Sequence, residues 1–289
     1  MERAIITSCS NKFFPSLINL IGSIEANYKD HPPIFVYNLG LLPNFVAELN
    51  GMNGVTVLPI PAFCNHWRSC YTWKSYIFIH PKARLNFYLD AGCQVLRPLD
   101  EIFNLIESDG YFSVSQDVPL ELITPHEFKK LFPIEEKYFQ ETCIAAGIFG
   151  FKNDSVITPV THHLYDASVA GLTLGFSSGD LWKNKGVNKN QFVRGCKLFR
   201  HDTTLLSLLM RQYLGDFKIH DVHKFASPIG KVDHPHQLIW NIRLNYKELE
   251  FIKLWYASGG RSYVQKFNKV IITLMIFMKT ILRNIKSKL

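Results

Sequence analysis

The fold is indicated by the stretch Arg84-Leu-Asn-Phe-Tyr-Leu-Asp90-Ala-Gly92-Cys-Gln-Val-Leu-Arg-Pro98-Leu-Asp-Glu-Ile-Phe103. Its short apolar run at 87–89 predicts a buried strand that delivers Asp90 to the strand's carboxyl end. Pro98 and the two acids that follow predict a helix, because proline suits the first turn and carboxylates suit its positive end. Ligands of open α/β sheets bind beyond the carboxyl ends of the strands, so Asp90 is a candidate site residue. The alternative is an aspartate that only caps the helix or turns the loop.

The segments on either side predict alternating strands and helices. Further strands are expected at residues 3–9, 34–37, 55–58, 110–115 and 217–222, and helices are expected to begin near Pro15, Leu42, Trp73, Ser155 and Arg200. A loop that feeds a strand is expected at 141–151. This alternation predicts an α/β fold of Rossmann type, with a mainly parallel sheet and helices on both faces.

The composition is that of a globular protein, with 289 residues, 47% hydrophobic and 19% charged. Met1 leads straight into a predicted strand without a signal-like segment, so we expect a cytoplasmic protein. The six cysteines form no Cys-x-x-Cys pair, which indicates reduced thiols. Cys64-x-His66 lacks a second pair at zinc spacing, so the pattern does not favour a zinc site.

The net charge of +8 is concentrated near the C-terminus. Seven basic residues and no acid follow Gly260, which leaves about +1 for residues 1–260. The body therefore lacks the charge of a nucleic-acid enzyme with a basic groove, and no nucleic-acid partner is expected. We expect a catalytic domain at 1–230 and a basic helical segment at 231–289.

The apolar run at 270–278 in that segment is flanked by lysines and arginines. At about 1.5 Å per residue it is too short to cross a hydrocarbon core of about 30 Å. An interfacial helix drawn to an anionic membrane surface fits the pattern, and docking onto the body or a second subunit is the alternative.

The segment from Tyr88 to Phe103 resembles the Asp-x-Asp segment of GT-A glycosyltransferases. It is similar in particular to the galactosyltransferase-like group, which includes glycogenin and lipopolysaccharide glycosyltransferases. Gly92 stands where that group has the second metal-binding aspartate, which makes the motif an Asp-Ala-Gly variant. The resemblance implies a GT-A fold and a nucleotide-sugar donor, most simply a UDP-sugar. It also implies that Asp90 is catalytic and binds a divalent cation, Mn²⁺ or Mg²⁺.

The same resemblance implies roles for residues elsewhere in the chain. Thr7, Ser8 and Asn11 would line the base and ribose, with a plain strand-end turn as the alternative. Lys74 would contact the donor diphosphate, and the alternative is a surface lysine beside a core tryptophan. Further substrate contacts are expected at the strand end and at the sugar-facing element: Gln116, Asp117 and Gly147.

His201 and Asp202 open a predicted helix and resemble the His-Asp-Gln helix start of related transferases, with Thr203 in place of glutamine. They are expected to be catalytic, and capping of the helix is the alternative. The polar stretch 175–200 has the length of a lid or binding loop. Its cations could meet a phosphate-bearing ligand or could simply be solvated: Lys183, Lys185, Lys189 and Arg194.

These observations predict a glycosyltransferase that moves a sugar from a nucleotide-sugar to a cell-surface glycan or lipid-linked acceptor. A basic tail would hold it at the inner face of the membrane. One alternative is another nucleotide-sugar or nucleotidyl enzyme on the same scaffold. The other is a non-catalytic, membrane-peripheral binding or assembly protein on a degenerate transferase fold, which the missing second aspartate favours.

Overall fold

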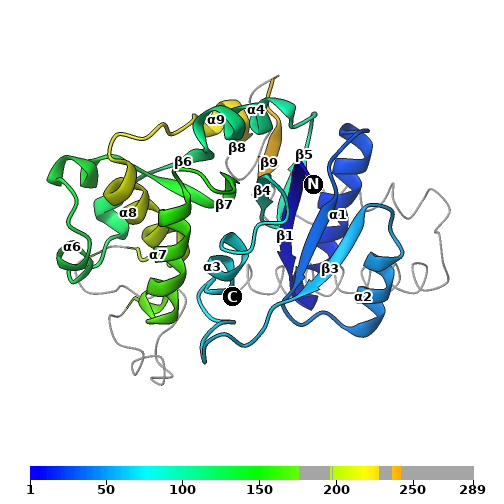
Figure 1. Ribbon diagram of the computed structural model, residues 1–289, viewed down its shortest axis with the longest axis horizontal. Coiled ribbons are helices and arrows are strands. Elements are labelled where there is room, and N and C mark those ends of the chain that lie inside the picture. Colours follow the sequence, from blue (N-terminus) through cyan, green and yellow to red (C-terminus); the bar gives the residue numbers. More distant parts are fainter. Residues whose placement is uncertain (176–195, 197, 228–235, 242–289) are drawn as a thin grey trace, which may run out of the picture.

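A six-stranded sheet forms the centre of the protein, which a computed structural model describes at residues 1–175, 196, 198–227 and 236–241 (Figure 1). The strand order is β3-β2-β1-β4-β7-β6. The first four strands pair in parallel and β7 runs antiparallel to both of its neighbours. The bounds are β1 (Arg3–Cys9), β2 (Ile34–Asn38), β3 (Val55–Pro59), β4 (Leu85–Leu89), β6 (Tyr111–Pro119) and β7 (Thr142–Lys152).

The predicted α/β fold with a mainly parallel sheet is therefore confirmed. The segment at 141–151 differs in detail, because the expected loop is already part of β7. The expected last strand is also different: residues 217–222 contribute only an isolated bridge between Val114 and His220. His220 is buried there against the rings of Phe112 and Phe225, and burial lowers the pKa of its imidazole.

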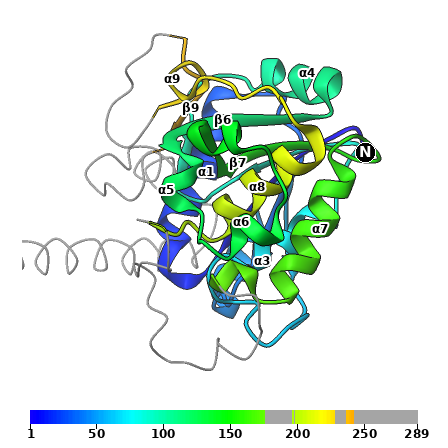
Figure 2. The same cartoon turned by 90° about the vertical axis from the view of Figure 1, so that its left-hand side faces the viewer.

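Helices cover both faces of the sheet. Figure 1 shows α1 and α2 at one end of the molecule and α7 and α8 at the other, and Figure 2 shows α7 and α8 packed side by side. The bounds are η1 (Asn11–Phe13), α1 (Phe14–Asn27), α2 (Pro43–Asn50), α3 (Trp73–Phe78), α4 (Asp100–Asp109), α5 (Leu120–Ile123), α6 (Phe128–Leu131), η2 (Glu136–Gln140), α7 (Thr158–Val169), η3 (Leu172–Leu174), α8 (Asp202–Leu214) and α9 (Val222–Phe225).

The two faces carry separate hydrophobic cores, because successive side chains of a strand point to opposite sides. On β4, Phe87 and Leu89 pack with α1, α2 and α4, whereas Tyr88 packs with α3 and α8. On β1, Ile5 belongs to the same core as Phe87, and Ile6 belongs to the same core as Tyr88. The central strands are therefore buried on both sides, as expected of strands covered by helices.

A second, small sheet extends the body beyond the predicted domain boundary at residue 230. It contains β5 (Cys93–Val95), β9 (Ile239–Asn241) and β8 (Ala226–Ser227), with β9 in the middle. Buried Ile239 places this sheet in the same core as α1 and α4. The apolar tail run at 270–278 and the four cations of the predicted lid loop lie outside the described residues.

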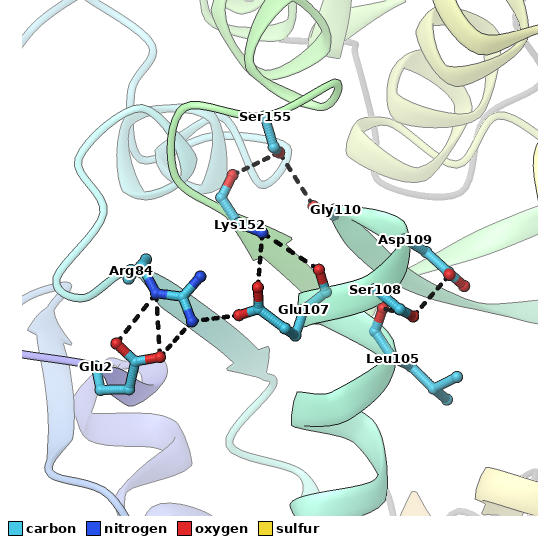
Figure 3. A network of polar contacts seen from close by, with 9 residues as sticks. All are labelled: Glu2, Arg84, Leu105, Glu107, Ser108, Asp109, Gly110, Lys152 and Ser155. Carbon is cyan, nitrogen blue, oxygen red and sulfur yellow. Dashed lines mark hydrogen bonds and ion pairs between the residues drawn. The ribbon is translucent and has the colours of Figure 1, made fainter.

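A network of ion pairs lies at the amino-terminal end of β4, opposite to Asp90 (Figure 3). Arg84 contacts Glu2 at the start of the chain and Glu107 on α4, and Lys152 of β7 reaches Glu107 at 2.8 Å. Hydrogen bonds from Arg84 and Lys152 lower the pKa of the Glu107 carboxyl to about 2. The network is exposed to solvent, so it stabilises the fold only weakly.

None of the described helices is long and apolar enough to cross a membrane. In the part of the chain that the structure describes, the cysteines form no disulfide with one another.

Gly150 of β7 lies against α4, so a substitution at this position measures how tightly the face of the sheet covered by α4 is packed. A Cβ at this position would lie 2.5 Å from the side chain of Ile106 and 2.9 Å from Phe112 Cβ. We predict that Gly150→Ala lowers the free energy of unfolding by about 1–3 kcal/mol, because the core is overpacked. Urea denaturation measures the loss. Gly51→Ala is the control, since its Cβ would be 3.4 Å from a carbonyl oxygen; an equal loss there would contradict the packing argument.

Candidate active site

Asp90 directly follows β4 at the carboxyl end of the parallel strands. Its backbone N–H donates a hydrogen bond of 2.8 Å to the Gly147 carbonyl oxygen of β7, which fixes the position of the residue. The side chain keeps 44% of its surface exposed. The sheet therefore presents one half-exposed carboxylate at the edge where ligands of α/β folds bind.

Gly147 makes room for this carboxylate. A Cβ at position 147 would overlap Oδ2 of Asp90. Because only glycine lacks this atom, the residue allows the antiparallel strand to pass close beside the acidic group. The sequence resemblance predicted that Gly147 faces the donor sugar. In the structure Gly147 is the immediate neighbour of Asp90.

Lys74 connects Asp90 to a second carboxylate. It lies in the first turn of α3, and its Nζ is 3.0 Å from Asp90 Oδ1 and 2.9 Å from Asp202 Oδ2. The Ala146 carbonyl oxygen also accepts a hydrogen bond from Nζ, at 3.4 Å. The lysine side chain is only 3% exposed. This burial is contrary to the alternative of a surface lysine, and contact with a diphosphate stays a prediction.

The charges of this group depend on each other. Burial acts to lower the pKa of the Lys74 ammonium, but the charges of Asp202 and Asp90 outweigh it and hold that pKa well above its usual value. Lys74 is therefore protonated at neutral pH. Burial raises the pKa of the Asp202 carboxyl, against the opposing effect of Lys74. With all three groups ionised, the group carries a net charge of −1.

A chain of hydrogen bonds ends on the same carboxylate oxygen of Asp90 that contacts Lys74. The Tyr88 hydroxyl donates to Asp90 Oδ1 at 3.0 Å and lies 2.8 Å from the hydroxyl oxygen of Ser8. Trp73 Nε1 donates to the same Ser8 oxygen at 3.2 Å. β1, α3 and β4 thus each contribute a polar group, and together they fix the direction of the carboxylate.

Asp202 begins α8, as the sequence predicted, and His201 immediately precedes it. His201 has a φ of +50°, and its Nδ1 lies 2.8 Å from the Thr173 carbonyl oxygen. Both residues are buried, at 7% and 5% exposure. The helix start therefore points its first carboxylate inward at Lys74 rather than toward solvent.

Not all of the predicted substrate residues join this group. Ser8 does, but Thr7 faces the opposite side of β1, as alternation requires, and is fully buried. The Asn11 side chain accepts a hydrogen bond from Leu42 N at 2.7 Å. Gln116 and Asp117 lie on β6, two strands from β4, where Ser115 donates to Asp117 at 2.8 Å. Substrate contacts by these four residues stay predictions.

The group around Lys74 can offer a divalent cation one carboxylate, that of Asp90. Within the described ranges no three His, Cys, Asp or Glu side chains gather in a metal-binding group. Asp202 is buried against Lys74, and Gly92 has no side chain to offer. Mg²⁺ often binds through one or two carboxylates together with ligand phosphates and water. A net charge of −1 and a half-exposed Asp90 fit that kind of shared site.

Sequence reasoning missed Tyr88, Trp73 and the Ala146 carbonyl. Tyr88 carried a usable signal, because residues i and i+2 of a strand share a face, so a tyrosine two residues before Asp90 points the same way. No local pattern pointed to the Ala146 carbonyl, because its approach to Lys74 depends on how β7 lies relative to the start of α3.

Comparisons with known proteins rest on structure alone, since no protein-family model and no curated protein matches the sequence. The apo form of mouse xyloside xylosyltransferase 1 has a TM-score of 0.53 at 11% identity, over 84% of this chain and 98% of that one. An active-site mutant of LgtC has a TM-score of 0.51 at 12% identity, over 92% and 99%.

The apo structure of WbbM, a bifunctional glycosyltransferase, has a TM-score of 0.50 at 12% identity and covers 80% of this chain. The chain spans only 41% of the WbbM chain. These likenesses show that the fold is that of GT-A glycosyltransferases. The fold implied by the sequence resemblance is thereby confirmed.

Replacing Lys74 by Met tests the charge arrangement. The variant leaves Asp202 buried without its cation, so we expect the free energy of unfolding to fall by about 3–5 kcal/mol at neutral pH. Loss of the ammonium raises the folded-state pKa of Asp202 further above its unfolded value. The variant is then relatively most stable in acid, where Asp202 is protonated in both states, and loses stability as pH rises through the folded pKa.

Denaturation of both proteins between pH 4 and 8 measures this divergence. The double variant Lys74→Met/Asp202→Asn should recover much of the loss, because neither buried charge remains. Lys218→Met, which removes a lysine side chain that is 57% exposed, is the control. A pH-independent loss in Lys74→Met would argue against the ion-pair interpretation.

Proposed function

We propose that the protein is a glycosyltransferase that transfers a sugar from a nucleotide-sugar donor, a UDP-sugar in the first instance, to a glycan or lipid-linked acceptor. The observation that carries this proposal is the half-exposed Asp90 carboxylate, held by Lys74 and Tyr88 at the ligand-binding edge of a GT-A fold. The fold supports glycosyl transfer as the reaction class. The position of the Asp90 carboxylate supports a role for Asp90 at the leaving diphosphate.

Transfer of a sugar from a nucleotide donor breaks the bond between the anomeric carbon and the diphosphate. The barrier falls when the charge on the departing diphosphate is neutralised. A divalent cation supplies this neutralisation when it is bound, and Asp90 is the described residue that would hold it. Lys74 keeps Asp90 and Asp202 in fixed positions, and Tyr88 aims the Asp90 carboxylate. Such preorganised charges need no rearrangement during the reaction.

The roles proposed for the neighbouring residues follow from their distance to Asp90. Asp202 and His201 are buried, and they are proposed to act as positioning residues: Asp202 holds Lys74, and His201 fixes the start of α8. Ser8 is proposed to meet the nucleoside at the end of β1, because its hydroxyl links Trp73 to Tyr88. Lys74 is proposed to act on the diphosphate through Asp90, since its own ammonium is covered.

The acceptor and the location are proposed from the sequence. The cationic tail after Gly260 supports binding to an anionic membrane surface. An enzyme held at the inner face of a membrane would meet a lipid-linked acceptor or a growing cell-surface glycan there.

A non-catalytic binding or assembly protein on the same fold is the second candidate. Gly92 and the pairing of both nearby carboxylates with Lys74 favour it, because they leave one carboxylate for a cation. A nucleotide-sugar that raises the melting temperature but is never turned over, with or without Mn²⁺, would support this candidate.

Asp90→Ala tests the proposed function. First, a thermal-shift screen of the wild-type protein against nucleotides and nucleotide-sugars identifies the donor, and release of the nucleotide is then followed with Mn²⁺, with Mg²⁺ and with EDTA. We expect Asp90→Ala to lower turnover at least about a hundredfold, because the cation that would neutralise the leaving diphosphate loses its carboxylate ligand, while thermal unfolding stays cooperative.

Asp216→Ala is the matched control, since this aspartate is 75% exposed on the surface. It should turn over the donor as the wild type does. Near-normal turnover by Asp90→Ala on the true donor would refute the catalytic role of Asp90. Equal turnover with EDTA and with Mn²⁺ would refute the requirement for a divalent cation.

A further inference from the structure

Tyr71 is a large aromatic residue that remains exposed beside the buried charges of the candidate active site. The residue is 44% exposed, although its ring is held by neighbours on two sides. Its centroid lies 5.4 Å from that of Trp73 and 6.0 Å from that of His201, with the planes tilted by 51° and 44°. The ring therefore has a defined position and still presents surface to a ligand.

The backbone at this position is strained. Cys70 and Tyr71 both have positive φ angles, of 50° and 62°, in the left-handed region that bulky side chains rarely adopt. Two successive residues of this kind persist only when their surroundings impose the conformation, and such strain gathers at ligand-binding sites. The strain is consistent with a ring that is held at one place for contact with a ligand.

The ring also borders the ionised group. Lys74 Nζ lies 5.2 Å from the centroid of Tyr71 and 5.3 Å from the centroid of Tyr88. Tyr88 is fully buried, so the ammonium lies between an inner ring and an outer, exposed one. Tyr71 therefore borders the ammonium that both carboxylates contact, and His201 lies beside it from the start of α8.

An exposed ring beside ordered polar groups matches the chemistry of a sugar. A pyranose has an apolar face of C–H groups, which can lie against an aromatic ring, and hydroxyls around its rim, which can bond to nearby polar groups. Small-molecule sites combine aromatic surface with a few placed polar groups in this way. A nucleotide base would use the ring equally well but would not need the carboxylates.

We propose that Tyr71 is the stacking platform for the pyranose ring of the acceptor. This inference rests on the proposed function, which assigns the diphosphate to Asp90 and the nucleoside to Ser8. Tyr71 contacts Trp73 of α3 and His201, which precedes α8, and it borders the ammonium that holds Asp90. We place the acceptor sugar on this exposed ring, next to the proposed donor site at Asp90. The ring fixes the plane of that sugar, and Asp202 and His201 lie at its side.

The test compares ring-deleting and ring-keeping variants. Tyr71→Gly removes the ring at a φ that glycine adopts without strain, so folding is preserved. Tyr71→Phe keeps the ring. Tyr213→Ala is the control, because Tyr213 is another partly exposed tyrosine that contacts a histidine, His163. It lies near the far end of α8, about 16 Å along the helix from Asp202.

Binding is measured by saturation-transfer NMR with methyl β-glucopyranoside, methyl β-galactopyranoside and methyl α-mannopyranoside as probes. We expect the wild type to saturate the ring C–H protons of at least one probe, and Tyr71→Gly to bind it about tenfold more weakly. Tyr71→Phe and Tyr213→Ala should bind as the wild type does. In transfer assays Tyr71→Gly should raise KM for the acceptor far more than KM for the donor.

Three results would overturn the platform: no probe bound by the wild type, unchanged binding by Tyr71→Gly, or an equal loss in Tyr71→Phe. Hydrolysis of the donor by the wild type tests the proposed function separately. If the wild type hydrolyses the donor and Tyr71→Gly binds the probe as tightly as the wild type, the role proposed for Tyr71 is wrong, but the proposed transferase function stands. If sugar binding depends on Tyr71 but no nucleotide-sugar is bound or turned over, the proposed transferase function is wrong, and the sugar-binding site at Tyr71 stands.

Discussion

The buried ammonium of Lys74, shared by Asp90 and Asp202, is the interaction on which the candidate site depends. A lysine with 3% exposure is tolerated only where opposite charges replace its lost hydration, and here the end of β4 and the start of α8 provide them. The same contacts hold three elements from distant parts of the sequence in one arrangement. One carboxylate is buried by this arrangement and the other stays half exposed, so the two acids are not equivalent.

β7 is the second constraint, because it runs against the direction of its neighbours and serves both faces of the sheet. Gly147 admits the Asp90 carboxylate on the face covered by α3 and α8, and Gly150 admits Ile106 of α4 on the other face. A side chain at either position would push against a residue that cannot easily move. Packing and the active site therefore depend on the same strand.

Local patterns were sufficient to predict much of the fold. The apolar run before Asp90, the proline at the start of α1 and the polar residues before α8 all marked elements that the structure contains. Residues 217–222 misled the prediction, since an apolar alternating run does not reveal whether a partner strand lies on both sides; only Val114 bridges to it. Thr7 and Ser8 show a similar limit, because adjacent strand residues face opposite ways and only Ser8 reaches Tyr88.

By itself the sequence determined the alternation of strands and helices, the place of Asp90 at a strand end and the start of a helix near Arg200, because each depends on neighbouring residues. Only the tertiary structure decided that Lys74 is buried, that it joins Asp90 to Asp202, and that Tyr71 stays exposed beside them. These features depend on how α3, β4, β7 and α8 cross, and contacts between distant elements leave no local pattern in the sequence.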